Sequence, residues 1–301
     1  MAAVAPGASR PVRLLGAGDI RGLAGRLGVQ PTKKLGQNFV VEPGTVRRIA
    51  ALAEPGPGDV LLEVGPGLGS LTLALLEAAG QSDARLVAVE IDPALAVELP
   101  RTIAERAPGA ADRVSVLTAD ALQLGERELG ALAPTVLAAN LPYNVAVPVV
   151  LHLLAALPSL ERGVVMVQAE VADRMCAGPG SRVYGIPSAK LAWYADTRSA
   201  GTVPRSVFWP VPNVDSKLVA FARHDPPPTT ASRAEVFAVI DAAFGQRRKT
   251  LRAALAGWAG SAPEAERTLR AAGVDPGARG ETLAVTDFAR IAEAQQRAGT
   301  K

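Results

Sequence analysis

Short apolar runs alternate with amphipathic segments along the first two thirds of the chain. The runs end in glycine or polar residues and predict buried strands, which lie at 59–64, 85–91, 114–117, 135–139 and 163–168. Between them, apolar residues recur at helical spacing at 70–79, from Pro93 onward and at 148–157. Strands that are apolar on both faces have to be covered on both sides. The alternation therefore predicts an α/β fold, with a parallel sheet between two layers of helices.

A proline-rich segment separates this region from a helical carboxyl-terminal part. Asp225-Pro226-Pro227-Pro228 is stiff and non-helical, which is typical of a linker. Beyond it, the periodicity predicts helices at 233–244, 248–258, 263–272 and 285–297. At the amino terminus, residues up to about Gly16 offer little to fill a core and are expected to be mobile, whereas 19–27 is expected to be helical. We divide the chain into residues 1–30, an arm with a short helix, residues 31–224, the α/β domain, and residues 225–301, a small all-helical domain.

Composition narrows the classes of protein that this chain can be. Its 301 residues are 49% hydrophobic and 20% charged, which suffices for a core and argues against global disorder. A formal net charge of +3 permits a nucleic-acid partner without demanding one. A single cysteine, Cys176, excludes a disulfide framework, and with only two histidines a metal centre is not expected. We accordingly expect no metal, no membrane span and a reducing, cytoplasmic location.

The strongest local signal is the glycine-rich turn Glu63-Val64-Gly65-Pro66-Gly67-Leu68-Gly69. Glycines after a strand let a ligand approach the backbone closely, so Gly65 and Gly67 are candidate ligand contacts. The sequence is not a nucleotide P-loop, because no Gly-Lys-Ser/Thr follows. It also departs from the dinucleotide fingerprint, whose third glycine comes one residue later. The alternative is a tight strand–helix turn that binds nothing.

Two carboxylates follow at the ends of the next strands. Glu90 ends the second strand and can accept hydrogen bonds from both hydroxyls of a ribose, although it could also be a solvated strand end. Asp120 ends the third and could accept one from an adenine amino group, although Asp is common in turns. Such residues at successive strand ends indicate a ligand at the carboxyl edge of an open sheet. Together they resemble the S-adenosylmethionine site of a class I, Rossmann-like methyltransferase.

Asn140-Leu141-Pro142-Tyr143-Asn144 follows the fourth strand. The segment resembles the signature of enzymes that methylate the exocyclic nitrogen of adenine, a poor nucleophile because its lone pair is delocalised into the ring. The Asn140 carboxamide oxygen and the Pro142 carbonyl would accept the hydrogens of that amino group, while Tyr143 would stack on the base. Asn140 would also lie against the cofactor. The alternative is a proline-containing turn capped by asparagine.

The chain as a whole resembles the ribosomal RNA adenine N6-dimethyltransferase family of the KsgA type. Beyond the motifs above, Leu35-Gly36-Gln37-Asn38-Phe39-Val40 is similar to the family's opening motif, in which Asn38 and Val40 would contact the cofactor. The segment 208–216 is similar to the family's Phe-x-Pro-x-Pro-x-Val-Asp-Ser motif, and Phe208 would form a second aromatic wall for the base. A further similarity at 246–250 opens the helical domain. The resemblance covers about Leu35 to Phe288.

This resemblance implies a methyltransferase that uses S-adenosyl-L-methionine to dimethylate two adjacent adenosines. The adenosines would lie in a hairpin loop near the 3′ end of 16S rRNA within the assembling 30S subunit. The enzyme would act as a monomer in ribosome biogenesis and rRNA processing. Residues 31–224 would then be the cofactor-binding catalytic domain, and residues 225–301 would contact RNA or the ribosome.

Basic residues gather at two places that could bind RNA. They are Lys33, Lys34, Arg247, Arg248, Lys249 and Arg252. On a helix running from Arg248 to Trp258, the apolar residues share one face and Lys249 and Arg252 fall on the opposite side. Such a basic outer surface suits backbone phosphates, although an ordinary solvated face gives the same pattern.

Other functions remain open at this point. A related enzyme would be the 23S rRNA adenine methyltransferase that confers macrolide resistance, since the motifs do not separate the two sharply. A protein of another class would be a ribosome-assembly factor whose catalysis is dispensable. An NAD-dependent dehydrogenase is disfavoured by the glycine spacing. DNA methylation is disfavoured because no further target-reading domain is evident.

Overall fold

The computed structural model describes residues 11–28, 38–142 and 145–299, and its chain divides into two compact units. The first comprises Met1–Ala172 and Arg198–Ala222, and the second Asp173–Thr197 and Arg223–Lys301. We call them the amino-terminal unit and the carboxyl-terminal unit. The three-part division expected from the sequence stays a prediction.

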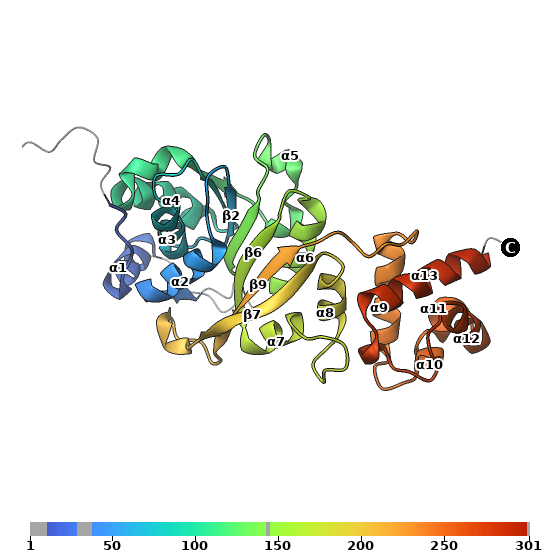
Figure 1. Ribbon diagram of the computed structural model, residues 1–301. Coiled ribbons are helices and arrows are strands. Elements are labelled where there is room, and N and C mark those ends of the chain that lie inside the picture. The colour runs from blue at the N-terminus through green and yellow to red at the C-terminus, as the bar shows by residue number, and fades with distance from the viewer. Residues whose placement is uncertain (1–10, 29–37, 143–144, 300–301) are drawn as a thin grey trace, which may run out of the picture. The chain divides into compact units, whose positions relative to one another are not determined.

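A seven-stranded sheet in the order β4-β3-β2-β5-β6-β9-β7 forms the centre of the fold (Figure 1). Its strands are β2 (Val60–Val64), β3 (Arg85–Glu90), β4 (Val114–Thr118), β5 (Val136–Asn140), β6 (Arg162–Gln168), β7 (Ala195–Val203) and β9 (Ser216–Arg223). The five strands from β2 to β6 pair in parallel, as the apolar runs predicted. Strand β9 instead runs antiparallel to β6, with Val165 opposite Val219.

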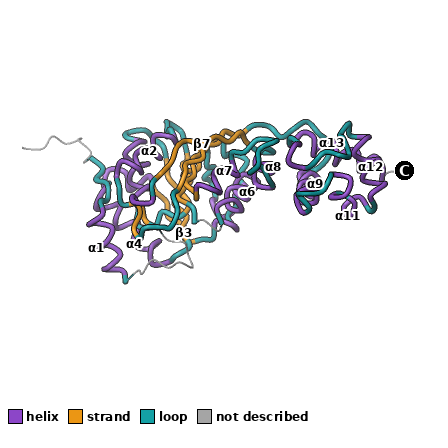
Figure 2. The backbone as a smooth tube through the Cα atoms, turned by 90° about the horizontal axis from the view of Figure 1, so that it is seen from below, coloured by secondary structure: helices purple, strands orange, loops and turns teal. Residues whose placement is uncertain are grey.

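Helices cover both faces of the parallel strands, with α2 and α4 on one side and α6 on the other (Figure 2). The helices of this part are α1 (Ala17–Leu27), α2 (Pro43–Ala53), α3 (Ser70–Ala79), α4 (Pro93–Arg106), α5 (Glu126–Leu129), α6 (Ala146–Ala156) and α7 (Ala169–Met175). Helix α3 has the bounds predicted from apolar spacing. Helix α4 begins at Pro93 because proline suits a first helical turn and the Asp92 side chain accepts a hydrogen bond from the amide of Ala94.

The segment before α1 is packed onto the amino-terminal unit. Leu15 is buried in the core, and the amide of Arg13 donates to the carbonyl of Arg106 at 2.9 Å. The Arg106 guanidinium also contacts the Asp19 carboxylate at 2.7 Å. The expectation of a mobile arm up to Gly16 is therefore wrong for residues 11–16, because long-range contacts that the local composition does not reveal hold them in place.

The carboxyl-terminal unit is mainly helical. It contains α8 (Ile186–Leu191), α9 (Arg233–Gly245), α10 (Leu251–Ala254), α11 (Ala256–Ala259), α12 (Ala262–Ala271) and α13 (Val285–Gly299). The single helix expected at 248–258 is wrong, since α10 and α11 are two short helices. The amides of Leu251 and Arg252 donate to the carbonyls of Ala278 and Pro276, and these tertiary bonds set where α10 begins. Within the described ranges, no helix is both long enough and apolar enough to cross a bilayer.

Candidate active site

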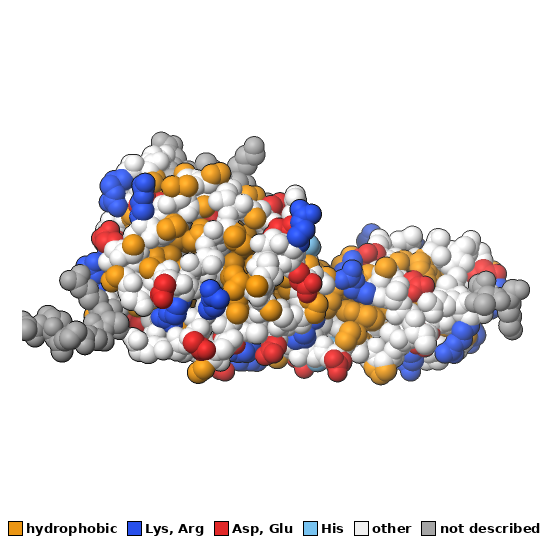
Figure 3. All heavy atoms as spheres, turned by 90° about the horizontal axis from the view of Figure 1, so that it is seen from above, with side chains coloured by type: hydrophobic (Ala, Val, Ile, Leu, Met, Phe, Trp, Pro, Cys, Tyr) orange, Lys and Arg blue, Asp and Glu red, His pale blue; other side chains and the backbone are white. Residues whose placement is uncertain are grey.

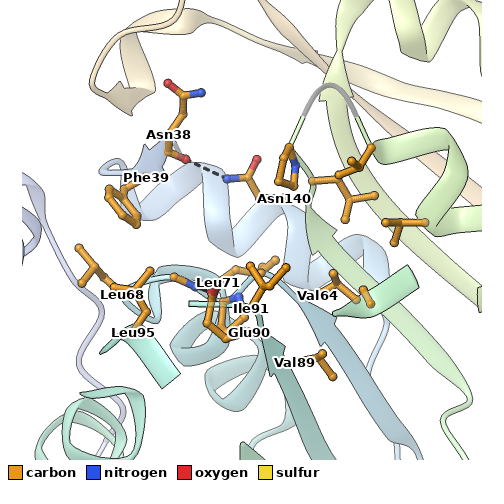
Figure 4. A pocket seen from close by; sticks show the side chains of 18 of the residues that line it. Asn38, Phe39, Val64, Leu68, Leu71, Val89, Glu90, Ile91, Leu95 and Asn140 are labelled. Carbon is orange, nitrogen blue, oxygen red and sulfur yellow. Dashed lines mark hydrogen bonds between the residues drawn. The ribbon is translucent and has the colours of Figure 1, made fainter. Parts of the chain in front are cut away.

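A cavity of about 260 Å³ lies at the carboxyl ends of β2, β3, β4 and β5 (Figure 4). Its lining residues come from five stretches of the chain, within 38–40, 64–71, 89–95, 119–122 and 140–149. All five belong to the amino-terminal unit. Parallel strands bring their carboxyl ends to one edge of the sheet, which is where open α/β sheets bind ligands. The cavity therefore lies where the fold itself favours a binding site.

The glycine turn forms one wall of the cavity. Gly65, Gly67 and Gly69 have φ values of +70°, +58° and +96°, a left-handed region in which other residues are strained. A Cβ on Gly67 would lie 3.0 Å from Cε1 of Phe39, and one on Gly69 would lie 2.9 Å from Cδ1 of Leu99. Backbone conformation thus favours glycine at all three positions, and close packing adds to this at Gly67 and Gly69.

Glu90 ties this turn to the end of β3. Its side chain is 5% exposed, and its two oxygens accept hydrogen bonds from the amides of Gly67 and Asp92, each at 3.0 Å. Burial raises the pKa of Glu90, while the two amides act in the opposite direction. Each carboxylate oxygen retains further acceptor capacity, so the group can still receive hydroxyls from a ligand.

Asp120 and two apolar side chains line another part of the cavity. The Asp120 carboxylate accepts a hydrogen bond from the amide of Leu122 at 2.9 Å and begins the short 3₁₀ helix Ala121–Gln123. Ile91 and Leu122 line the same cavity and are 56% and 36% exposed. Polar groups accompanied by exposed apolar side chains in one cavity suit a flat ligand with a polar edge.

A hydrogen bond to the opening motif fixes the orientation of the Asn140 side chain. Its side-chain Nδ2 donates to the carbonyl of Asn38 at 3.0 Å, the dashed bond of Figure 4. Because the nitrogen is used in this bond, the carboxamide oxygen is the atom that can accept a hydrogen bond from a ligand. Sequence position alone gives no sign of this orientation, since the two residues are 102 positions apart.

The opening strand is itself held from several sides. Strand β1 (Phe39–Val40) pairs antiparallel with β8 (Phe208–Trp209), and the Val40 carbonyl accepts from the Ser70 hydroxyl at 2.8 Å. The ring of Phe39 stacks on that of Trp209, with centroids 6.4 Å apart. These contacts place Phe39 over Gly67 at the cavity wall.

The structure brings most of the candidate site residues together. Those that line the cavity are Asn38, Val40, Gly65, Gly67, Glu90, Asp120, Asn140 and Pro142. Phe208 is not among the lining residues, because its side chain is 2% exposed and packs in the core. Tyr143, Lys33 and Lys34 lie outside the described residues.

Sequence reasoning passed over two residues of this region. Phe39 lies between two candidate contacts, yet it was assigned no role of its own. In the sequence, Glu63 stands out only as the start of the glycine motif, and it is 1% exposed in the structure. An acidic residue within a strand expected to be buried on both faces was the available signal, since carboxylates are seldom fully buried without a partner.

The basic residues around α10 differ in their surroundings. Arg247 pairs with Glu281 at 3.0 Å and donates to the carbonyl of Arg182, and Arg252 pairs with Glu266 at 2.8 Å. Arg248 and Lys249 are exposed, and their side chains have no partner in the part of the chain that the structure describes. On the face drawn in Figure 3, positive and negative side chains are interspersed within each unit.

The sheet order, with β9 antiparallel, and the site at the carboxyl ends define the fold of a class I methyltransferase. The model of the family described as ribosomal RNA adenine dimethylase matches residues 29–297. This chain belongs to that family. It is therefore a methyltransferase, and its methyl donor is S-adenosylmethionine. Among the described residues, no cluster of three or more His, Cys, Asp or Glu could hold a metal ion.

Individual relatives agree with this assignment. Ribosomal RNA small subunit methyltransferase A of Thermobifida fusca is 65% identical over 285 residues, which are 95% of this chain and 97% of that protein. The protein of the same name from Streptomyces coelicolor is 63% identical, over 94% of this chain and 97% of its own length.

Two solved structures share the fold over most of the chain. A dimethyladenosine transferase from Plasmodium falciparum superposes with a TM-score of 0.67 at 22% identity, covering 83% of this chain and 94% of that one. The 23S rRNA methyltransferase ErmE superposes with a TM-score of 0.62 at 26% identity, covering 86% and 100%. The same scaffold is therefore present in a methyltransferase described as acting on the large-subunit RNA.

Proposed function

We propose that this protein transfers methyl groups from S-adenosylmethionine to N6 of two adjacent adenosines in 16S rRNA. The adenosines lie in a hairpin loop near the 3′ end, within the assembling 30S subunit, and the monomeric enzyme acts in the cytoplasm as part of small-subunit biogenesis. One observation carries the proposal: the Asn140 carboxamide, oriented by the Asn38 carbonyl, lines the same cavity as the glycine turn and Glu90. The names of the relatives support the choice of RNA.

The cavity residues suit this methyl donor. Gly65 and Gly67 let the donor reach the backbone, Glu90 offers oxygens to its ribose hydroxyls, and Asp120 can accept a hydrogen bond from its adenine amino group. Ile91 and Leu122 would cover the apolar faces of the adenine, and their present exposure fits that role. Asn38 and Val40 close the cavity on the side of β1. When bound, the donor supplies an electrophilic methyl group on a positively charged sulfur.

The proposed acceptor groups, on Asn140 and Pro142, line the same cavity. The Asn140 carboxamide oxygen and the Pro142 carbonyl hold the two hydrogens of the target amino group, which turns the nitrogen lone pair toward the methyl group. Positioning of this kind can remove about 7–11 kcal/mol of an activation barrier. The methylated amine can lose its proton to water afterwards, so Asn140 needs no strong base beside it.

Aromatic side chains complete the proposed base site. Tyr143 follows Pro142 directly and stacks on the target base. Phe208 takes part as a second wall only if the packing of β8 changes, because its side chain is 2% exposed. In the described structure, Phe208 packs in the hydrophobic core and is paired with Val40 of β1.

RNA contacts outside the base site come from basic residues. Arg248 and Lys249 are exposed and unpaired among the described residues, which suits them to phosphate binding. Arg247 and Arg252 contribute more weakly, because ion pairs with Glu281 and Glu266 already engage them. Lys33 and Lys34 remain candidates on the basis of their charge and their place beside the opening motif.

Transfer of tritiated methyl groups to purified ribosomal particles tests the proposal. Immature 30S particles are expected to be labelled, and nucleoside analysis should yield N6,N6-dimethyladenosine in 16S rRNA. Label in 23S rRNA would instead favour the activity of ErmE-like enzymes, which the names of the relatives do not favour. Normal 30S assembly in cells that carry only Asn140→Ala would favour an assembly factor whose catalysis is dispensable.

A further inference from the structure

Glu63 is a buried carboxyl group to which the proposed reaction assigns no part. It lies on β2, is 1% exposed, and its Oε2 accepts a hydrogen bond from the Thr72 hydroxyl of α3 at 2.7 Å. Its Oε1 has no hydrogen-bond partner among the described residues. The surroundings therefore offer this group only neutral donors from Thr72 and leave one of its two oxygens unsatisfied.

The charge near Glu63 has the wrong sign to stabilise a carboxylate. The ionisable group that faces it is Glu90 at the end of β3, and no Lys, Arg or His of the described residues pairs with it. A carboxylate without a cation is strongly disfavoured in a buried site, so the group is expected to keep its proton. Burial first, and then the charge of Glu90, raise the pKa of Glu63 from 4.5 to about 8.

Glu90 differs from Glu63 although the two lie close together. Backbone amides of two residues, Gly67 and Asp92, donate to the two oxygens of Glu90, which favours its charged form, whereas Glu63 has donors from Thr72 alone and one oxygen without a partner. Two neighbouring carboxyls of unequal surroundings share their charge unequally. The geometry therefore places the negative charge on Glu90 and the proton on Glu63.

The bond to Thr72 connects this proton to the donor cavity. Thr72 lies in the first turn of α3, directly after the glycine turn. In the same turn, the Ser70 hydroxyl holds the Val40 carbonyl of β1 at 2.8 Å. Glu63 thus anchors the first turn of α3. That turn directly follows the glycine turn and supports β1 through the Ser70 hydroxyl.

We propose that Glu63 is a positioning residue of the donor site and acts as a neutral carboxylic acid. It fixes the first turn of α3 through Thr72 and leaves Glu90 as the charged partner of the glycine turn. The proposal rests on the function proposed above, in which Glu90 binds the donor. Ionisation of Glu63 would place a second, unpaired negative charge beside Glu90 and loosen the turn.

The pH dependence follows from these protonation states. Because the folded protein binds the Glu63 proton more tightly than the unfolded chain does, this group makes the free energy of unfolding fall as pH rises from about 4.5 to about 8. Above that range the stability contribution is already lost. Donor affinity behaves differently, since it decreases only as Glu63 ionises in the folded protein, at pH values near and above 8.

Calorimetric titration with S-adenosylmethionine between pH 6.5 and 9.5, as chosen conditions, tests the proposal on three proteins: the wild type, Glu63→Gln and Glu77→Gln. If binding requires neutral Glu63, wild-type affinity falls about tenfold between pH 7 and 9 beyond the loss due to the donor's own amino group. Glu63→Gln cannot ionise, so it should lack this extra fall. Glu77→Gln is the matched control, because Glu77 lies on α3, the helix that carries Thr72, but is ion-paired to Arg47, and it should follow the wild type. Equal pH profiles for the wild type and Glu63→Gln would overturn the proposal.

Two further measurements keep the proposal testable if Glu63→Gln is unstable. The infrared spectrum of the wild type at pH 7 should contain the carbonyl band of a protonated carboxylic acid, which weakens as the pH rises through about 8 and is absent from Glu63→Gln. Its absence from the wild type would show that Glu63 is charged and the proposal wrong. Thr72→Val should weaken donor binding, while Thr72→Ser, which keeps the hydroxyl, should restore it.

The failure of this inference can be told apart from failure of the proposed function. Wild-type protein that neither binds S-adenosylmethionine nor transfers methyl groups at pH 7 would contradict the proposed function itself. Wild-type protein that binds and transfers, with a pH profile that Glu63→Gln leaves unchanged, would contradict the role of Glu63 alone.

Discussion

The donor cavity and the basic cluster around α10 differ in how closeness along the chain relates to a shared site in the structure. The cavity gathers residues that are spread from Asn38 to Val149 along the chain. The cluster consists of neighbours in sequence, yet Arg247 and Arg252 are held by Glu281 and Glu266 while the two residues after Arg247 remain free of described partners. Closeness in sequence is thus a weaker guide to a shared role than position at the end of a strand.

The difference has a structural reason. Strand ends are placed by a hydrogen-bonded ladder that fixes their register, as in the pairing of Val64 with both Val89 and Ala139. The turn between α9 and α10 has no such ladder, so the partner of each of its side chains depends on which residue the tertiary packing brings near, as Glu281 for Arg247. If this contrast holds, substitutions in the cavity should affect one shared function, whereas substitutions in the cluster should have different effects.

The largest effect is expected from Asn140→Ala. Removing the carboxamide deletes the proposed acceptor for the adenine amino group, so methyl transfer should fall about 100-fold or more. Donor affinity should fall by about tenfold at most, because the variant also loses one hydrogen bond, to Asn38. Single-turnover transfer and calorimetry measure the two quantities. Asn213→Ala, at an exposed asparagine, is the control, and equal losses of donor affinity and turnover for Asn140→Ala would restrict Asn140 to donor binding.

A smaller loss, in donor binding rather than in transfer, is expected from Glu90→Ala. The variant leaves the amides of Gly67 and Asp92 without their acceptor and removes the proposed ribose contact. A hydrogen bond to a charged group contributes about 1.5–3 kcal/mol, which corresponds to roughly 10- to 100-fold in affinity. Calorimetry should show this change, whereas Glu105→Ala, an exposed carboxylate of α4, should bind as the wild type does. Unchanged donor affinity in Glu90→Ala would show that Glu90 takes no part in donor binding.

Gly67→Ala should affect both stability and the cavity. Alanine in the left-handed conformation costs about 1–2 kcal/mol, and its Cβ would press on Phe39 at 3.0 Å. Gly58→Ala is the matched control, since Gly58 has φ +79° but open space around a Cβ. Chemical denaturation should show a loss of stability in both variants, larger in Gly67→Ala because of the contact with Phe39, and only Gly67→Ala should weaken donor binding. Equal donor affinity in both would mean that the contact with Phe39 does not shape the cavity.

The smallest effects are expected in the basic cluster, where substitutions of Arg248 and Arg247 should have different consequences. Arg248→Ala is expected to weaken RNA binding by a few fold and to reduce its salt dependence by about one phosphate contact. Arg247→Ala should instead lower stability by about 1 kcal/mol or less, through its pair with Glu281. Filter binding over a salt series and thermal unfolding distinguish these outcomes. If both variants lose RNA affinity equally, the cluster acts as a unit and the contrast with the cavity does not hold.

Much of the site could be predicted because its signals are local. The glycines of the turn, the carboxylates at strand ends and Asn140 each follow an apolar run, and parallel pairing then requires them to share one edge. Helix α2 was missed although its own signals were present: Pro43 stands at the first turn, Glu42 caps it, and Val46, Ile49 and Ala50 form its buried face.

Tertiary structure decided the rest. By itself, the sequence determined where strands and helices alternate and which residues end the strands, because apolar spacing and glycine conformation act within a few residues. The antiparallel β9, the division of the helix expected at 248–258, the bond from Asn140 to Asn38 and the unpaired burial of Glu63 depend on contacts between distant segments. Such contacts depend on the packing free energy of the whole unit. A local sequence pattern does not reveal that free energy.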